Sequence, residues 1–409
     1  MTPRLHTLPN GLSIIVDPVP GAQSAAVGLH AGVGSRAEAF GQGGLAHMLE
    51  HMVFKGAAGR SARQIAEAIE DVGGHLNAWT GRDQTVFHAR TLAADVPLAV
   101  NLIADLLREP DLDADELERE KGVVLSELGE YRDNPEDFAG DLLFEAAFGG
   151  QALGRPIIGT EQSVRALTRN DLTDWMRREL VASRLLLVAA GAVDEDALLA
   201  LAEKRFGDMA ASPPPATVQA SFGGGERIDA RSCEQAHWSF ALPGPAAGAA
   251  AMPATSIFSQ AVGGGMSSRL FQMLREERGL AYSIYSWTQG FADSGLFAVS
   301  AATDCSDAAA ALALARQIVR AAADDLSPQE VSRARAQIEA GLLMSLETAQ
   351  GRADHHARNF EIFGRLVPLA ETLDEIRAVD AVAARAAGAA LHEGPTALAC
   401  VGGNLALAA

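Results

Sequence analysis

The sequence predicts an α+β protein built from two similar domains, each with a mostly antiparallel sheet and helices packed on one face. Three observations support this prediction: the length of 409 residues, two halves with the same outline, and strands and helices that do not alternate regularly. A chain of this length is too long for one small core and suits two domains of about 200 residues each.

A proline-rich stretch divides the chain almost in half. The run Ala211–Ala216 contains three consecutive prolines, which exclude a helix and favour an extended linker. We therefore predict an N-terminal domain over residues 1–210 and a C-terminal domain over residues 217–409.

The two halves repeat one pattern, in which a helical segment precedes an apolar strand that closes with glycine. In the first half, Val164–Leu167 precedes Leu185–Gly191. In the second half, Ile376–Val379 precedes Ala397–Gly402 at nearly the same spacing. Similarity over so long a period indicates a duplicated domain.

The order of strands and helices in the first half indicates the fold class. Residue patterns predict strands over Gln23–Gly32 and Thr85–Leu92, and helices over Ala62–Val72, Val96–Leu107 and Asp115–Tyr131. This order lacks the alternation of a doubly wound fold. It predicts helices that cover one face of a mostly antiparallel sheet.

Composition limits the classes of partner. Hydrophobic residues make up 48% of the chain and charged residues 21%, which is ordinary globular usage. The formal net charge of -19 argues against nucleic acid, because phosphate backbones attract clusters of Lys and Arg. An acidic surface suits basic peptides, although it also simply favours solubility.

The N-terminal residues and the cysteines indicate a soluble protein of a reducing cytoplasm. The chain opens with polar residues and no apolar signal block, and no run approaches the roughly 18 apolar residues of a membrane helix. Cys233, Cys305 and Cys400 are odd in number and far apart, so we expect neither a disulfide framework nor a metal knuckle. Cys400 lies in an apolar run and is expected to be a core thiol.

The segment from Gly44 to Phe54 carries the strongest chemical pattern. Its apolar residues form one helical stripe that we expect to face the core, namely Leu45, Met48, Leu49, Met52 and Val53. At about 100° per residue, His47, Glu50 and His51 fall within one arc on nearly the opposite side. Both imidazoles can therefore reach a single ion.

This arrangement favours zinc. Two imidazoles and one carboxylate leave a fourth position for water, whose pKa the ion lowers. Glu50 lies between the two ligands and can take the proton of that water. The pattern H-x-x-E-H is a zinc-peptidase motif, and the alternative is a coincidental surface cluster.

Spacing alone leaves the third ligand open. The helix that follows Asp113 carries several glutamates, namely Glu116, Glu118, Glu120, Glu127 and Glu130. Glu120 and Glu127 are seven residues apart and share one face, whereas Glu118 points elsewhere. Each of them could also belong to a solvated helical face.

Several glycine-rich segments complete the pattern: Leu8–Leu12, Gly32–Arg36, Gly43–Gly56, Gly73–Ala78 and Gly154–Gly159. Together they resemble the pitrilysin-type (M16) metallopeptidases, and most of all the mitochondrial processing peptidase beta-subunit and its bacterial relatives. The resemblance covers essentially the whole chain. It implies a LuxS/MPP-like metallohydrolase fold with a catalytic zinc-binding N-terminal domain and an inactive, homologous C-terminal domain that contributes to the substrate cleft.

The resemblance also assigns site residues. It implies one Zn²⁺ held by His47, His51 and Glu127, and a supporting role for Glu120, which suits a residue that orients a ligand or water. In the second half it implies that Arg275 and Tyr282 reach the substrate at the zinc, where they would stabilise a developing anion. Ordinary packing at a helix–strand junction is the alternative for this pair.

The resemblance places the substrate along an edge strand. The segment Asn77, Ala78 and Trp79 matches this strand, and strand addition binds an extended peptide through main-chain hydrogen bonds. Trp79 could equally be a buried sheet aromatic.

These implications combine into one predicted function. The chain would be a zinc-dependent endopeptidase that cleaves extended peptides or basic, presequence-like segments, with Glu50 as general base. The alternative is a non-catalytic structural or chaperone-like subunit, which the intact zinc set disfavours. With one repeat pair only, the chain is expected to form a homodimer, or a heterodimer with a related subunit.

Overall fold

The computed structural model describes residues 2–213, 218–403 and 405. The chain forms two compact units, and each takes segments from both halves of the sequence. The first unit comprises Met1–Leu128, Ile157–Thr217 and Leu343–Val367, and the second comprises Gly129–Pro156, Val218–Leu342 and Pro368–Ala409. The predicted linker Ala211–Ala216 lies partly outside the described residues.

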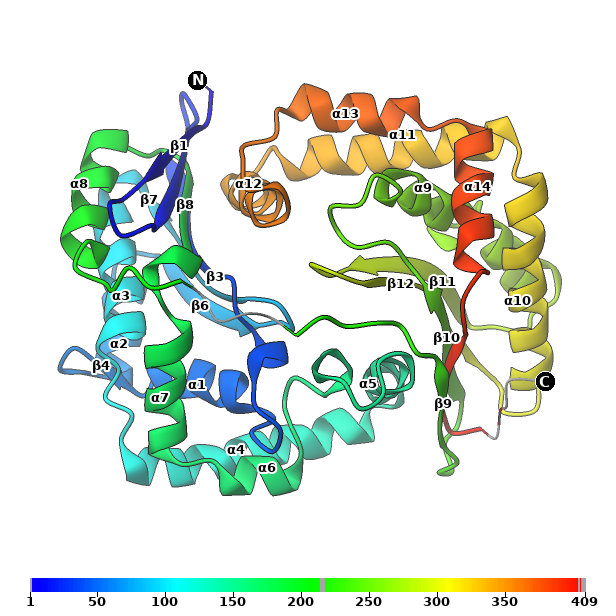
Figure 1. The fold of residues 1–409 in the computed structure, drawn as a ribbon, viewed down its shortest axis with the longest axis horizontal. Helices are drawn as coiled ribbons and strands as arrows, with labels where there is room; N and C mark the ends of the chain where they lie inside the picture. Colours follow the sequence, from blue (N-terminus) through cyan, green and yellow to red (C-terminus); the bar gives the residue numbers. More distant parts are fainter. Residues whose placement is uncertain (1, 214–217, 404, 406–409) are drawn as a thin grey trace. The chain divides into compact units, whose positions relative to one another are not determined.

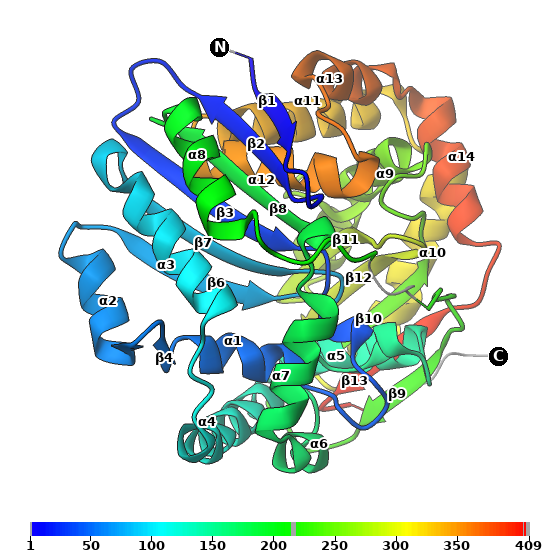
Figure 2. The ribbon, with the colours of Figure 1, turned by 60° about the vertical axis from the view of Figure 1, so that its left-hand side comes forward.

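The first unit is built on a mostly antiparallel sheet with strand order β1-β2-β8-β3-β7-β6, in which β2 and β8 are parallel. Its strands are β1 (Arg4–Thr7), β2 (Ser13–Pro18), β3 (Ser24–Ala31), β6 (His75–Thr80), β7 (Thr85–Leu92) and β8 (Leu185–Gly191). Figure 2 shows β6 at the edge of this sheet, beside helix α1 (Leu45–Val53). A short hairpin, β4 (Gly56–Ala57) and β5 (Arg60–Ser61), follows that helix.

Helices cover one face of the first sheet, and the larger hydrophobic core of this unit lies between these helices and the sheet. Their apolar residues, such as Met52, Ile103 and Phe206, are buried against inward-facing strand residues such as Leu29 and Phe87. Apart from α1 and one helix on the opposite face, the helices that begin in this unit are α2 (Ala62–Glu70), α3 (Val96–Arg108), α4 (Ala114–Asp133), α6 (Glu161–Ala166), α7 (Arg169–Glu179) and α8 (Glu195–Phe206).

The second unit has the same design around a sheet with strand order β11-β12-β10-β13-β9, in which β13 and β9 are parallel. The strands are β9 (Gly225–Asp229), β10 (Ala236–Pro243), β11 (Ser283–Gly290), β12 (Gly295–Thr303) and β13 (Ala397–Val401). The helices are α9 (Met252–Gly263), α10 (Ala308–Asp325), α11 (Pro328–Ser345), α13 (Leu369–Ala378) and α14 (Ala381–Leu391), with a π-helical segment over Phe271–Glu277.

Each sheet also carries one helix on its opposite face, and that helix comes from the other half of the chain. In the first unit, α12 (Ala349–Phe363) buries Ala353 and Ala357 against Ile15 and Val188. In the second unit, α5 (Pro135–Ala147) buries Leu143 and Ala147 against strands β10 and β13. Figure 1 shows orange α12 with the first unit and teal α5 with the second.

A buried charge anchors α12 to the first sheet. Asp17 on β2 is fully buried and accepts hydrogen bonds from Arg352 Nε at 2.6 Å and His356 Nε2 at 3.0 Å. These donors more than offset the effect of burial and lower the pKa of Asp17 to about 2. His356 thus pairs with a carboxylate of the first sheet.

The predicted α+β class is confirmed: both sheets are mostly antiparallel and carry helices. The predicted helices and strands of the first half lie within two residues of α2, α3, α4, β3 and β7. The predicted layer of helices on one face describes the larger core of each unit, and α5 and α12 add a single helix on the other face. Along the described parts of the chain, none of the helices combines the length and the apolar character needed to cross a bilayer.

Candidate metal centre

Helix α1 presents the predicted histidines because its start is tightly held. Its N-cap, Gly44, has φ of 87°, and a Cβ at this position would lie 2.5 Å from the carbonyl oxygen of Ile158. The buried carboxylate of Glu38 accepts hydrogen bonds from the backbone N–H groups of Gly44 at 3.1 Å and Ala46 at 2.9 Å. Glu38 thus satisfies donors that the first helical turn leaves unpaired.

The stripe on the other side of α1 fixes the rotation of the helix. The predicted apolar residues Leu45, Met48, Leu49, Met52 and Val53 are all buried. His47, Glu50 and His51 are only partly buried and lie on the face that the stripe leaves free.

Two imidazoles and one carboxylate meet in the first unit. His47 Nε2 lies 3.6 Å from Glu127 Oε1, and His51 Nε2 lies 3.5 Å from Glu127 Oε2. One ligand atom from each residue falls within 4.8 Å of the other two. In the described part of the chain, no other group of three or more His, Cys, Asp and Glu side chains is as compact.

The donor set fits zinc. Catalytic zinc takes three ligands of the imidazole and carboxylate type and keeps one position open. Burial, reinforced by the neighbouring His51 imidazole, lowers the pKa of His47 from 6.5 to about 4. His47 is therefore neutral at pH 7, which is the form that binds a metal ion.

A carboxylate orients His51 from behind. The Nδ1 atom of His51 lies 3.0 Å from Oε2 of Glu120, which is 4% exposed. The other Glu120 oxygen lies 2.6 Å from the ammonium nitrogen of Lys55. This chain of contacts sets the proton of His51 on Nδ1 and leaves the lone pair of Nε2 directed towards Glu127.

Glu50 is held by the edge strand. The hydroxyl of Thr80 on β6 donates a hydrogen bond of 2.6 Å to Glu50 Oε2. Burial raises the pKa of Glu50 above its usual value, and the Thr80 hydroxyl partly opposes this rise. A raised pKa suits a carboxyl that must accept a proton and then return it.

The predicted substrate strand corresponds to β6, which pairs with β7 and forms one edge of the sheet. Trp79 is 42% exposed, which is inconsistent with the alternative of a buried sheet aromatic. Asn77 is also exposed, whereas Ala78 is buried on the core side.

The second unit brings Arg275 and Tyr282 together. The guanidinium carbon of Arg275 lies 6.0 Å from the centre of the Tyr282 ring, and Tyr282 is 72% exposed. This geometry matches a weak cation–π contact on an open surface. The role of the pair at the metal stays a prediction.

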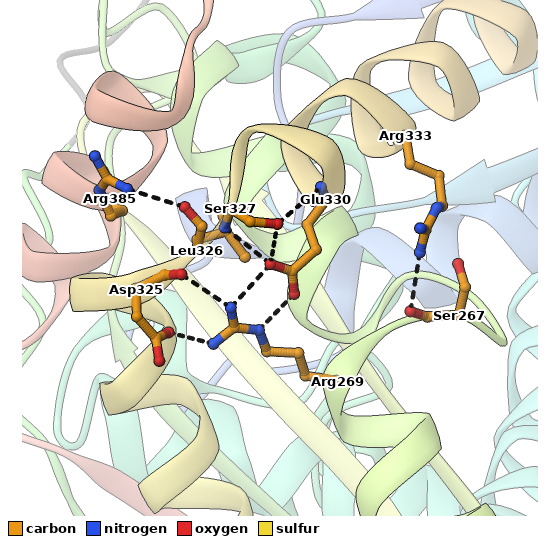
Figure 3. A network of polar contacts seen from close by, with 8 residues as sticks. All are labelled: Ser267, Arg269, Asp325, Leu326, Ser327, Glu330, Arg333 and Arg385. Atoms are coloured by element: carbon orange, nitrogen blue, oxygen red, sulfur yellow. Dashed lines mark hydrogen bonds and ion pairs between the residues drawn. The ribbon is translucent and has the colours of Figure 1, made fainter.

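A charge network holds the start of the segment that carries this pair (Figure 3). Arg269 contacts both oxygens of Glu330, at 2.5 and 2.9 Å, and also pairs with Asp325. Glu330 in turn accepts a hydrogen bond from the backbone N–H of Ser327 at 2.8 Å, as a capping residue of α11 does. Bidentate arginine–carboxylate pairs of this kind are geometrically specific.

Three residues of the site were not found from the sequence. Lys55 lies two residues past the end of α1, so helical spacing does not indicate it. Thr80 lies two residues after Ala78 on the same strand face, but no local pattern connects it with Glu50. Glu38 lies in a loop, where no periodicity identifies a capping side chain.

Two family profiles match successive parts of the chain. Residues 14–161 match the insulinase family (peptidase family M16), and residues 166–338 match the peptidase M16 inactive domain. The first match contains the cluster of His47, His51 and Glu127, and the second contains Arg275 and Tyr282.

Relatives that are 31–38% identical to this chain are named zinc proteases. An uncharacterized zinc protease of Mycobacterium tuberculosis is 38% identical over 386 residues, which cover 93% of this chain and 88% of that protein. An uncharacterized zinc protease of Bacillus subtilis is 31% identical and covers 92% of each chain.

Solved structures share the fold. A peptidase M16 inactive domain from Pseudomonas fluorescens aligns with a TM-score of 0.90 at 19% identity and covers 99% of both chains. A protease from Helicobacter pylori aligns with a TM-score of 0.88 at 20% identity and covers 97% of this chain and 99% of that chain.

Proposed function

The chain belongs to the insulinase family of peptidases, M16, and from this premise we propose that it is an endopeptidase that cleaves extended peptides. The observation that carries this proposal is the cluster of His47, His51 and Glu127 within 4.8 Å, beside Glu50 on the same helix as the two histidines. Its cofactor is zinc, because the relatives are named zinc proteases and the donor set fits that ion.

His47, His51 and Glu127 are the residues that would hold the zinc ion. Zinc bound there supplies a Lewis acid that makes water more acidic and polarises a carbonyl group. Glu120 and Lys55 act through His51, because their contacts keep its Nδ1 protonated and its Nε2 free.

Glu50 performs the proton transfers. Its carboxylate accepts a proton from the attacking water and then donates it to the leaving amine. The hydrogen bond from Thr80 occupies Oε2 and leaves Oε1 as the oxygen that handles the proton. The partly buried position keeps this carboxyl basic enough for the exchange.

The edge of β6 provides the binding surface for the substrate. An extended peptide would add to this edge through main-chain hydrogen bonds, which any sequence can form. Asn77 and Trp79 extend their side chains from the exposed face of the strand, so they can contact alternate substrate side chains. Thr80 belongs to the same strand, and a peptide bound there lies beside the hydroxyl that holds Glu50.

Basic peptides are the preferred substrate class in this proposal. The net charge of -19 favours the approach of cationic segments, and this attraction weakens with salt. Arg275 and Tyr282 are proposed to donate hydrogen bonds to the developing oxyanion. The expected homodimer, like the alternative heterodimer, stays a prediction.

Peptide cleavage followed by mass spectrometry tests this function. Extended peptides with internal Lys and Arg residues are incubated with the zinc-loaded chain, with the chelated chain, and with the chelated chain after zinc is restored. We expect internal cleavage that chelation removes and zinc restores. Matched peptides in which Gln replaces Lys and Arg should be cleaved more slowly, with a smaller difference at high salt. A zinc-loaded chain that cleaves none of the peptides would favour the non-catalytic subunit instead.

A further inference from the structure

The three cysteines of the chain meet in the second unit, although 72 and 95 residues separate them in sequence. Cys305 Sγ donates a hydrogen bond of 3.1 Å to the carbonyl oxygen of Gly402 and lies 3.7 Å from the carbonyl oxygen of Cys233. Gly402 follows Cys400 by two residues, at the end of β13. The proteolytic site in the first unit uses none of these thiols.

Gly402 lies beside both Cys233 and Cys305. Gly402 has φ of +85°, and a Cβ built there would lie 2.7 Å from Cys233 Cβ and 3.2 Å from Cys233 Sγ. Cys233 therefore packs against the open side of Gly402, while Cys305 binds its carbonyl oxygen. A side chain at this glycine would displace Cys233.

The sheet register supports the same proximity. Strands β10 and β12 are antiparallel, and their last pair at this end is Ala236 with Thr303. Cys233 lies three residues before Ala236 and Cys305 two residues after Thr303, so both follow directly from this end of the ladder. The contact between Cys305 Sγ and the Cys233 carbonyl oxygen shows that the two segments stay adjacent beyond the end of the ladder.

The cluster is not a metal site. Within the described residues, the compact set of metal-binding side chains is the histidine–glutamate cluster on α1 and α4, and it includes no cysteine. The sulfur atoms of cysteine ligands must each lie about 2.3 Å from one zinc ion. The cysteine cluster is therefore better suited to the chemistry of a sulfur pair.

Burial separates Cys400 from the other two cysteines. Cys305 is exposed and Cys233 is half-buried, whereas Cys400 is fully buried, as predicted for a core thiol. Burial raises the pKa of Cys400 to about 11, so this thiol stays protonated at neutral pH. Only a thiolate attacks a disulfide. Cys400 is therefore an inert neighbour of the pair.

We propose that Cys233 and Cys305 are a redox modification site, at which a low-molecular-weight disulfide such as glutathione disulfide installs a reversible intramolecular disulfide. The exposed Cys305 thiolate attacks one sulfur of the oxidant and releases the first thiolate. The Cys233 thiolate then attacks Cys305 Sγ and releases the second. The two protons of the protein thiols pass to the two released thiolates, so the oxidant gains the two electrons that the cysteines lose.

The disulfide would link the segment between β9 and β10 to the segment between β12 and α10. The intervening chain contains Arg275 and Tyr282, so oxidation would restrain the segment that carries them. Closing a loop of this length also restricts the unfolded chain, which stabilises the second unit.

Thiol counting and peptide mapping of the full chain test this proposal. The native protein is incubated with glutathione disulfide, blocked with a maleimide and analysed by mass spectrometry. The expected product has one free thiol in place of three, a mass lower by about 2 Da before blocking, and a cross-linked peptide that contains Cys233 and Cys305. Reduction with dithiothreitol should restore all three thiols.

Single variants identify the sulfur atoms. Cys233→Ser should trap a mixed disulfide on Cys305, and Cys305→Ser should remove the intramolecular link. Cys400→Ser is the matched control and should still form the link. Oxidised wild-type protein that carries only a stable glutathione adduct, that links Cys400, or that forms only links between chains would overturn the proposal.

Discussion

The Nδ1 atom of His51 lies 3.0 Å from Oε2 of Glu120. This contact fixes which nitrogen of the imidazole faces the other ligands. It explains why the buried Glu120 lies next to the cluster of His47, His51 and Glu127 but is not one of its metal-binding residues. Lys55 completes the arrangement, because its ammonium group balances the charge of Glu120 at 2.6 Å.

Replacing Lys55 should therefore weaken zinc binding, although Lys55 is not itself a metal-binding residue. We expect Lys55→Met to bind zinc about ten- to a hundredfold less tightly in a chelator competition, because Glu120 loses the partner that holds it against His51. Lys121→Met is the matched control, since Lys121 also pairs with a glutamate, Glu118, at 2.7 Å. Equal zinc affinities for the two variants would contradict this role.

The choice of third ligand can be tested on one helix. Glu127→Gln should lower zinc affinity by at least a hundredfold, because a neutral amide replaces the carboxylate near both histidine Nε2 atoms. Glu130→Gln changes an exposed glutamate three residues further along and should leave binding intact. Zinc content after dialysis measures both variants, and the assignment fails if Glu130→Gln is the variant that loses the ion.

Thr80 should act on the rate of cleavage rather than on substrate affinity. Thr80→Val removes the hydrogen bond to Glu50, and we expect kcat to fall about tenfold with KM nearly unchanged. Thr80→Ser should recover most of the rate. Thr91→Val is the control in the neighbouring strand β7, because the buried Thr91 hydroxyl has no partner among the described residues. A fall in kcat for Thr91→Val equal to that for Thr80→Val would point to general damage of the sheet.

The docking of α12 should make the first unit sensitive to acid. Burial and neighbouring cationic groups lower the pKa of His355 from 6.5 to about 4. The folded chain therefore binds this proton less readily than the unfolded chain, and stability falls as pH drops from about 6.5 towards 4.

The His355→Gln variant isolates this effect. Between pH 7 and pH 5, the wild-type free energy of unfolding should fall by on the order of 1 kcal/mol more than that of the variant. Urea unfolding at the two pH values measures the difference. Equal losses in both proteins would show that His355 does not carry the acid sensitivity.

Local patterns were sufficient to predict helix α1 and its chemistry. The spacing of His47, Glu50 and His51 places them on one helical face in any context, and the apolar stripe identifies the opposite face. Glu127 required the family resemblance, because several glutamates of α4 share its local features.

Long-range contacts could not be read from the sequence in the same way. The amphipathic pattern of α12 does not tell which sheet the helix covers, and its partner Asp17 lies more than 300 residues away. Likewise, the three cysteines look isolated along the chain. Only the pairing of β10, β12 and β13 brings their connections together.

Zinc content and peptide cleavage of Glu50→Gln, measured on the same preparation, test the central claim most directly. The substitution keeps the size of the side chain but removes its ability to accept a proton, while the three metal-binding side chains remain. We predict the same zinc content per chain as in the wild type and a loss of cleavage of at least a thousandfold, in line with removal of a general base. Cleavage at the wild-type rate by the zinc-loaded variant would contradict the account.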